Sequence, residues 1–376
     1  MLDRREFLSS AAVAALAASP IARAAAPKRG FTEQAYAKAI VIDALGGPGG
    51  YDPDSPDGQL TPSMLADVKT SGVTAVNLTV SSVGNDAGVF EQTVAALGYS
   101  EKMINEHPDL FMKVLTGRDL SAAKTAGRMG IIYGFQDTSP LDGRLDRLTV
   151  FHGLGVRIIQ PCYNRRNLMG DGCLEPANGG LSTLGHELIA ELNKLKILVD
   201  FSHAGARTQS EGIAASKTPM AITHTGCRAL VDVPRNTHDT ELKAVADRGG
   251  VVGIYFMPFL RASGQPHAED LIRHLEHAVN VCGEDHVGLG TDGGISAIKL
   301  DEKYAAFQRK FYEDRAKAGI AAPGEAADVF NLVPEYNDAR RFFTLANDLT
   351  DRGWAPKRVE KILGANFARL FGEVWG

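Results

Sequence analysis

Short, nearly continuous apolar stretches recur along the chain, and each is followed by a pattern of helical period. Runs without apolar–polar alternation are typical of parallel strands covered on both faces. Nine such runs are candidate strands: Ile40–Ala44, Val73–Val80, Phe111–Leu115, Gly130–Phe135, Val156–Gln160, Ile197–Phe201, Met220–Thr223, Gly250–Phe256 and His286–Gly290. Helical patterns lie between them, for example Thr61–Ser71, Thr183–Leu195, Thr240–Arg248 and Ala268–Cys282. This alternation predicts a parallel α/β fold.

Eight strands with one extra would close a (β/α)8 TIM-type barrel. The alternative is a doubly wound open sheet. The first candidate strand leads into Gly46-Gly47-Pro48-Gly49-Gly50, a glycine-rich stretch that we interpret as a loop interrupted by proline. Neither a dinucleotide-binding nor a phosphate-cradling glycine motif is present, which favours the barrel. The segment from Glu335 to Gly376 is helical in pattern and no linker follows residue 30, so residues 27–376 are predicted to be one domain.

The composition is that of an ordinary globular protein, with 376 residues of which 44% are hydrophobic and 23% charged. It excludes a disordered or coiled-coil protein. The formal net charge of −5 provides no basic field for nucleic acid. Four cysteines are too few for a disulfide scaffold. A bridge between Cys162 and Cys173 and four buried thiols remain alternatives.

The N-terminus has the pattern of an export signal. Arg4-Arg5 precedes Phe7-Leu8 and a weakly apolar, alanine-rich stretch, which is the twin-arginine pattern. The stretch is too short for a membrane span, and small residues near positions 24–26 offer a cleavage site. We therefore expect residues 1–26 to be removed after export by the twin-arginine machinery, leaving a periplasmic protein without a stable membrane span.

Polar residues with metal-binding side chains stand at the ends of three candidate strands. These strands end in Val199-Asp200-Phe201-Ser202-His203, in Ile222-Thr223-His224 and in Leu289-Gly290-Thr291-Asp292. In a barrel, the chemistry lies at this end of the strands. Two imidazoles and a carboxylate suit a divalent metal such as zinc, and three ligands with an open fourth position are typical of a catalytic site. Arg235-Asn236 follows in the next loop, where a guanidinium could clamp a carboxylate.

Several segments, in order along most of the mature chain, resemble the membrane (renal) dipeptidase family of zinc peptidases, which are amidohydrolase-type barrels. They are Ile159-Gln160-Pro161-Cys162-Tyr163-Asn164-Arg165-Arg166-Asn167, Gly180-Leu181-Ser182, the segments ending in His203, His224 and Asp292, and Pro234-Arg235-Asn236. The resemblance implies a site of two zinc ions that share a bridging carboxylate. It places His203 and His224 on the second metal and Asp292 at the first, where Asp292 also handles the proton of the attacking water. Arg235 would hold the substrate carboxylate.

The sequence departs from the family pattern on the side of the first metal. The positions of a His-x-Asp ligand pair hold Leu45 and Gly47, and Gln136 stands where the bridging glutamate is expected. Tyr163 replaces a histidine that polarises the substrate. Without these anionic ligands a second dication lacks charge compensation. We therefore predict one zinc ion rather than two, held by His203 and His224 and completed by Asp292, Gln136 or water.

These observations favour a single-metal hydrolase that cleaves a small dipeptide-like amide with a metal-activated water. Asp292 would carry the proton, Tyr163 or Asn164 would donate to the oxyanion, and Arg235 with Asn236 would bind the substrate. The substitutions at Leu45, Gly47 and Gln136 motivate an alternative, a non-catalytic periplasmic binding or maturation protein on a dipeptidase scaffold. Lyase or isomerase chemistry on a peptide-derived metabolite is a third hypothesis, because fold does not determine function.

Overall fold

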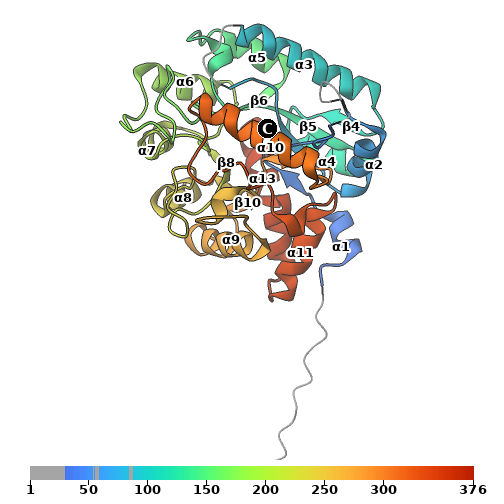
Figure 1. Cartoon of the computed structure of the whole chain (residues 1–376). Helices are drawn as coiled ribbons and strands as arrows, with labels where there is room; N and C mark the ends of the chain where they lie inside the picture. Colours follow the sequence, from blue (N-terminus) through green and yellow to red (C-terminus); the bar gives the residue numbers. More distant parts are fainter. Residues whose placement is uncertain (1–29, 54, 56–58, 84–87) are drawn as a thin grey trace, which may run out of the picture.

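The computed structural model describes residues 30–53, 55, 59–83 and 88–376 (Figure 1). The predicted export signal, residues 1–26, lies outside the described residues. No helix in the described ranges is long and apolar enough to cross a membrane.

In the described part of the chain, eight parallel strands form the wall of a barrel. Five pair in the order β1-β3-β5-β6-β7, and three in the order β10-β9-β8. The eight strands are β1 (Ile42–Asp43), β3 (Ala75–Thr79), β5 (Met129–Phe135), β6 (Val156–Ile159), β7 (Leu198–Val199), β8 (Ala221–Thr225), β9 (Val251–Ile254) and β10 (Val287–Leu289). The predicted (β/α)8 barrel is therefore confirmed.

The extra strand of the prediction is β4 (Phe111–Lys113), which pairs with the first half of β5. The second half of β5 pairs with β6 instead, so β4 occupies the space beside β5 before β6 begins. Two short strands were not predicted. β2 (Gly46–Gly47) and β11 (Gly293–Gly294) pair in parallel just beyond the ends of β1 and β10. The interpretation of Gly46–Gly50 as loop is wrong for its first two residues, because paired glycines have no side-chain pattern that would mark a strand.

Helices pack around the outside of the wall (Figure 1). The α-helices are α1 (Glu33–Lys38), α2 (Pro62–Ser71), α3 (Val89–Glu106), α4 (Gly117–Ala126), α5 (Arg147–Leu154), α6 (Thr183–Lys194), α7 (Ala206–Ala215), α8 (Asp239–Asp247), α9 (Ala268–Cys282), α10 (Glu302–Lys317), α11 (Arg341–Asp351), α12 (Pro356–Glu360) and α13 (Asn366–Trp375). The segment from Glu335 is helical, as predicted. Its last helix, α13, packs Phe367 and Phe371 against buried residues of the strands such as Ile42, Ile132 and Val251. This apolar cluster leaves the opposite end of the barrel for the polar residues.

The two sheets join at two seams, and a buried aspartate spans each one. At the first seam the N–H of Ala44 donates to Leu289 O at 2.9 Å, and Asp43 accepts from Thr291 N (2.7 Å) and Thr291 Oγ1 (2.6 Å). At the second seam Asp200 accepts from Thr223 N (2.9 Å) and Thr223 Oγ1 (2.6 Å). Since a regular ladder is interrupted at both places, the carboxylates supply hydrogen bonds that the backbone does not.

The burial of Asp43 predicts a specific dependence of the protein's stability on pH. Burial raises the pKa of Asp43 from 3.8 to about 7. Between these values the folded protein holds a proton that the unfolded chain has lost. The free energy of unfolding should therefore fall as the pH rises from about 4 to about 7, by up to about 4 kcal/mol from this group. Urea denaturation at pH 4.5, 5.5 and 6.5 measures this slope.

The matched variant is Asp43→Asn, whose amide can still accept from Thr291 N while donating to Thr291 Oγ1. This variant should lose the share of the slope that Asp43 contributes, whereas Asp109→Asn on the exposed surface should keep the whole slope. Burial also raises the pKa values of Asp200 and Asp292, which supply the remainder. A slope that persists unchanged in Asp43→Asn would show that another group causes it.

Candidate active site

The two predicted histidines meet at the open end of the barrel, across the second seam. His203 follows β7 and His224 lies in β8, and both are buried. Their Nε2 atoms are 3.0 Å apart. The Oε1 atom of Gln136, the residue after β5, lies 3.1 Å from His203 Nε2. The structure thus brings together three of the four side chains predicted to bind metal.

Hydrogen bonds determine which nitrogen of each imidazole carries the proton. Asn164 donates its Nδ2–H to Ile320 O, so its Oδ1 faces His203 and accepts from Nδ1 at 2.6 Å. The hydroxyl of Thr223 donates to Asp200, so its oxygen accepts from Nδ1 of His224 at 2.9 Å. Each imidazole is therefore protonated on Nδ1, and each Nε2 presents a lone pair to the other.

The charge state of the imidazoles suits metal binding. Burial lowers the pKa of His203 and of His224 well below the usual range, and the positive charge of Arg235 lowers both further. Both rings are therefore neutral at pH 7. Gln136 adds a third acceptor, because its Nε2 donates to Thr79 Oγ1 at 3.0 Å and its oxygen faces His203.

These three side chains fit a single metal ion. Two nitrogen ligands at about 2.0–2.1 Å from a tetrahedral zinc are about 3.3 Å apart, close to the separation of the two Nε2 atoms. Two facing lone pairs with no proton between them repel, and a shared cation removes this repulsion. Two imidazoles and an amide oxygen are a donor set that zinc accepts. On the side of the first metal, Leu45 is a buried apolar residue and Gly47 has no side chain, so neither offers a ligand.

Asp292 does not join the imidazoles in a metal-binding group. Within the described ranges, no three His, Cys, Asp or Glu side chains converge in this way. Asp292 is half-buried, has a left-handed backbone (φ 59°) and donates its N–H to Leu45 O at 2.8 Å. Burial raises the pKa of its carboxyl group, and the charges of Arg235 and Arg315 oppose this shift. Its predicted roles as a ligand and proton carrier stay predictions.

Arg235 lies beside the imidazoles. The Nη2 atom is 3.4 Å from His203 Nε2, and Nη1 donates to Ser202 O at 2.5 Å. The guanidinium lies 5.8 Å from the ring centroids of both Tyr255 and Phe259. Arg235 is only 2% exposed, and no carboxylate of the described residues forms an ion pair with it. A buried guanidinium that forms no ion pair with a carboxylate of the protein is suited to bind an anionic ligand.

The remaining predicted residues fall into two groups. Tyr163 stacks on the ring of His203, with centroids 3.9 Å apart, and faces the site. Asn164 and Asn236 are instead occupied by the protein. The Asn236 amide donates to Val231 O and Phe259 O and accepts from the hydroxyl of Tyr255. We assign both asparagines the role of positioning neighbouring groups, and their predicted substrate contacts stay predictions.

Sequence analysis missed two contributors to the site. Arg315 comes from α10, which crosses the barrel in Figure 1, and its Nη1 donates to Tyr163 OH at 3.2 Å. It is held by Glu325 through contacts of 2.6 and 2.8 Å. Cys173 lies beside Asn164, and its thiol donates to Asn164 Oδ1. All four cysteines are free thiols in this structure, so the Cys162–Cys173 bridge is not formed. A polar helix after the last barrel strand has no pattern that marks Arg315.

Comparison with known proteins places this geometry in a family. The model of the membrane dipeptidase family (peptidase family M19) matches residues 62–305. The crystal structure of an amidohydrolase from Pseudomonas aeruginosa is 32% identical, covers 91% of this chain and 98% of that one, and superposes with a TM-score of 0.76.

Two curated relatives are similar in sequence. An uncharacterized protein in the pqqA 5′ region of Klebsiella pneumoniae is 29% identical, over 69% of this chain and 88% of its own length. The dipeptidase aclJ of Aspergillus oryzae is 28% identical over 76% of this chain, and the match spans 62% of that protein. The barrel, the paired imidazoles at its open end and the family match over residues 62–305 agree: the chain belongs to the membrane dipeptidase family of metallopeptidases, peptidase family M19.

Proposed function

We propose that this chain is a periplasmic hydrolase that cleaves a small, carboxylate-bearing amide such as a dipeptide, with one metal ion held by His203, His224 and Gln136. The observation that carries the proposal is the convergence of two unprotonated Nε2 atoms and an amide oxygen at one point. A divalent ion bound there supplies a Lewis acid that polarises a carbonyl group and lowers the pKa of a coordinated water. Leu45 and Gly47 offer no ligands for a second ion, which supports one metal per chain.

Arg235 orients the substrate through its carboxylate. The guanidinium is desolvated and lies 3.4 Å from His203 Nε2, so a carboxylate bound to it has its neighbouring amide beside the imidazoles. The contact with Ser202 O holds the guanidinium in place. A charge-assisted pair in a buried position is strong because little water competes for it.

Tyr163 and Asp292 carry out the proton and hydrogen-bond chemistry. Burial raises the pKa of Tyr163, so its hydroxyl stays protonated. The phenolic oxygen accepts from Arg315, which leaves the O–H free to donate to the carbonyl oxygen as negative charge develops there. Asp292, which is half-buried and within the electrostatic range of Arg235, takes the proton of the attacking water and returns it to the leaving amine.

Arg4-Arg5 and the alanine-rich stretch that follows support export of the folded chain to the periplasm. Cell fractionation of Arg4→Lys/Arg5→Lys beside the unchanged protein tests this part of the proposal. The paired variant should accumulate uncleaved in the cytoplasm.

Metal removal tests the hydrolase itself. The mature chain is stripped with a chelator, dialysed, and reconstituted with zinc, manganese or cobalt. Metal content and hydrolysis of a dipeptide panel are then measured. We expect about one ion per chain and turnover that is lost on stripping and restored on reconstitution. A chain that retains no metal and cleaves no dipeptide under any of these conditions would refute the proposal.

The loss of donors at Leu45 and Gly47 favours a second candidate, a non-catalytic binding or maturation protein on the same scaffold. In that case a dipeptide should bind equally well before and after chelation, and His203→Ala should leave binding unchanged.

A further inference from the structure

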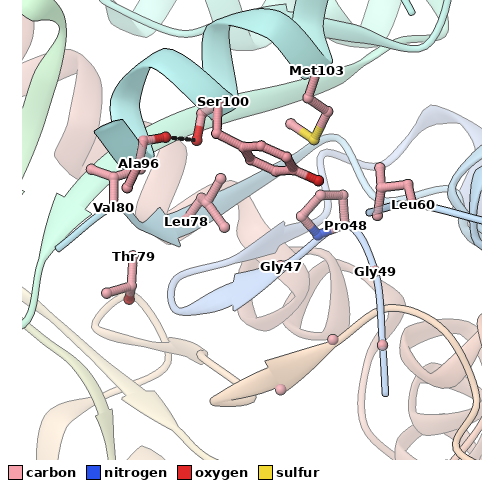
Figure 2. Close-up of a pocket in the computed structure, with 14 residues that line it drawn as sticks. Gly47, Pro48, Gly49, Leu60, Leu78, Thr79, Val80, Ala96, Ser100 and Met103 are labelled. Atoms are coloured by element: carbon pink, nitrogen blue, oxygen red, sulfur yellow. Dashed lines mark hydrogen bonds between the residues drawn. The ribbon is translucent and has the colours of Figure 1, made fainter. Parts of the chain in front are cut away.

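A pocket adjoins the site, and the proposed mechanism does not use it. It has a volume of about 540 Å³, which is in the range of small-molecule pockets. The β2–β11 pair, the end of β3 and helix α3 line it, and it is open on one side. Figure 2 shows Pro48, Leu60, Leu78 and Met103 gathered around the same space. None of its described lining residues carries a charge.

The pocket is connected to the imidazoles by a short chain of contacts. Thr79 lines the pocket and accepts from Gln136 Nε2 at 3.0 Å. Gln136 Oε1 lies 3.1 Å from His203 Nε2, which in turn lies 3.4 Å from Arg235 Nη2. Along this chain Thr79 Oγ1 and the guanidinium are at most about 12 Å apart. Thr79 and Arg235 are therefore the two ends of this sequence of contacts, and the imidazole of His203 stands between them in it.

We infer that this pocket binds an apolar side chain on the N-terminal residue of the substrate. The inference rests on the proposed function, because it takes Arg235 as the carboxylate site. An extended chain advances about 3.3–3.6 Å per residue, so a dipeptide spans about 7 Å from its carboxylate. With the carboxylate on Arg235 and the amide beside the imidazoles, the first residue reaches Gln136 and Thr79, and its side chain enters the pocket. Substrates with a large apolar first residue are preferred.

The size of the preference follows from the area that the pocket removes from water. Burying a side chain as large as that of phenylalanine strengthens binding by about tenfold to a hundredfold over glycine. The comparison of Phe-Gly with Gly-Gly isolates this contribution, because the two dipeptides share the same amide and carboxylate.

Two substitutions from different elements fill the pocket. A Cβ atom at Gly47 would lie 3.7 Å from Leu78 Cδ1, which is ordinary contact, so Gly47→Leu projects into the space. Ala96→Phe enters from α3. Ala95→Phe places the same ring on the exposed face of that helix and is the matched control.

Calorimetry measures the Kd of Phe-Gly and of Gly-Gly for the metal-free mature chain and the three variants, and turnover of both dipeptides is measured separately. We expect Phe-Gly to bind at least tenfold more tightly than Gly-Gly. This preference should disappear in Gly47→Leu and Ala96→Phe and persist in Ala95→Phe.

Equal affinities of the unchanged protein for the two dipeptides, or a preference that survives both pocket-filling variants, overturn the inference even if both dipeptides are cleaved. The expected preference without turnover under any added metal supports the pocket and refutes the hydrolase. If neither dipeptide binds, the inference about the pocket is overturned, whereas turnover with added metal decides the proposed hydrolase separately.

Discussion

Replacing His224 with alanine is expected to lower kcat on a dipeptide by at least about a thousandfold and to release the bound metal. The variant removes one of two imidazole nitrogens that face each other at 3.0 Å, and it leaves His203 with Gln136 alone. A neutral amide and one imidazole are too few ligands to retain zinc through desalting. Metal content by mass spectrometry and steady-state hydrolysis measure the two effects.

The matched control is His186→Ala, because His186 is exposed on α6. It should retain full metal content and activity. Because His224 is buried, circular dichroism and the urea midpoint show whether His224→Ala is folded, and His224→Asn provides a second variant with a polar side chain. A folded His224→Ala protein that keeps its metal and more than a tenth of its activity would contradict the proposed ligand set.

Arg235→Met is expected to lower kcat/KM on a dipeptide by about a hundredfold to a thousandfold, because it removes a buried charged partner of the substrate carboxylate. The effect should depend on that carboxylate. Amidation of the substrate C-terminus should lower kcat/KM of the unchanged protein by a similar factor and leave kcat/KM of the variant almost unchanged. Hydrolysis of each dipeptide and of its C-terminal amide by both proteins completes this double-mutant cycle.

Arg228→Met is the control for loss of a nearby positive charge, since Arg228 is paired with Asp232 at the surface. It should leave both substrates unaffected. If Arg235→Met lowers kcat/KM equally for the dipeptide and for its C-terminal amide, Arg235 supports the site through Ser202 O and the imidazoles and does not bind the substrate carboxylate.

Most of the architecture could be predicted from the sequence because the parallel strands are buried on both faces and therefore appear as unbroken apolar runs. The supernumerary strand β4 departs from this pattern, because it includes Lys113 and only Phe111 in it is buried. β2 and β11 escaped prediction because their glycines pair through backbone alone. The predicted bounds of α2 and α6 agree with the structure to within one residue at each end, and the side chains of Thr61 and Ser182 cap the first turns of these helices.

The candidate site was only partly predictable. His203, His224 and Gln136 follow strands, so the barrel brings them together wherever the strand ends are assigned correctly. The roles of Asn164 and Asn236 depend on which neighbours take up their amide groups, and neighbours distant in sequence, such as Ile320 and Phe259, are not visible in a linear pattern. Arg315 reaches the site from α10 for the same reason.

The aspartates at the seams have a consequence for ligand affinity. His203 follows β7 of one sheet and His224 lies in β8 of the other. The two imidazoles therefore meet only while the two sheets keep their register. A slip of one residue along a strand is about 3.3 Å, as large as the gap between the two nitrogens. Asp200 opposes such a slip beside the imidazoles, and Asp43 opposes it at the other join. For the proposed metal site, closure of the barrel and binding of a cation are therefore thermodynamically coupled: a change that separates the two sheets lowers the affinity for the ion, and an ion bound there stabilises the join between the sheets.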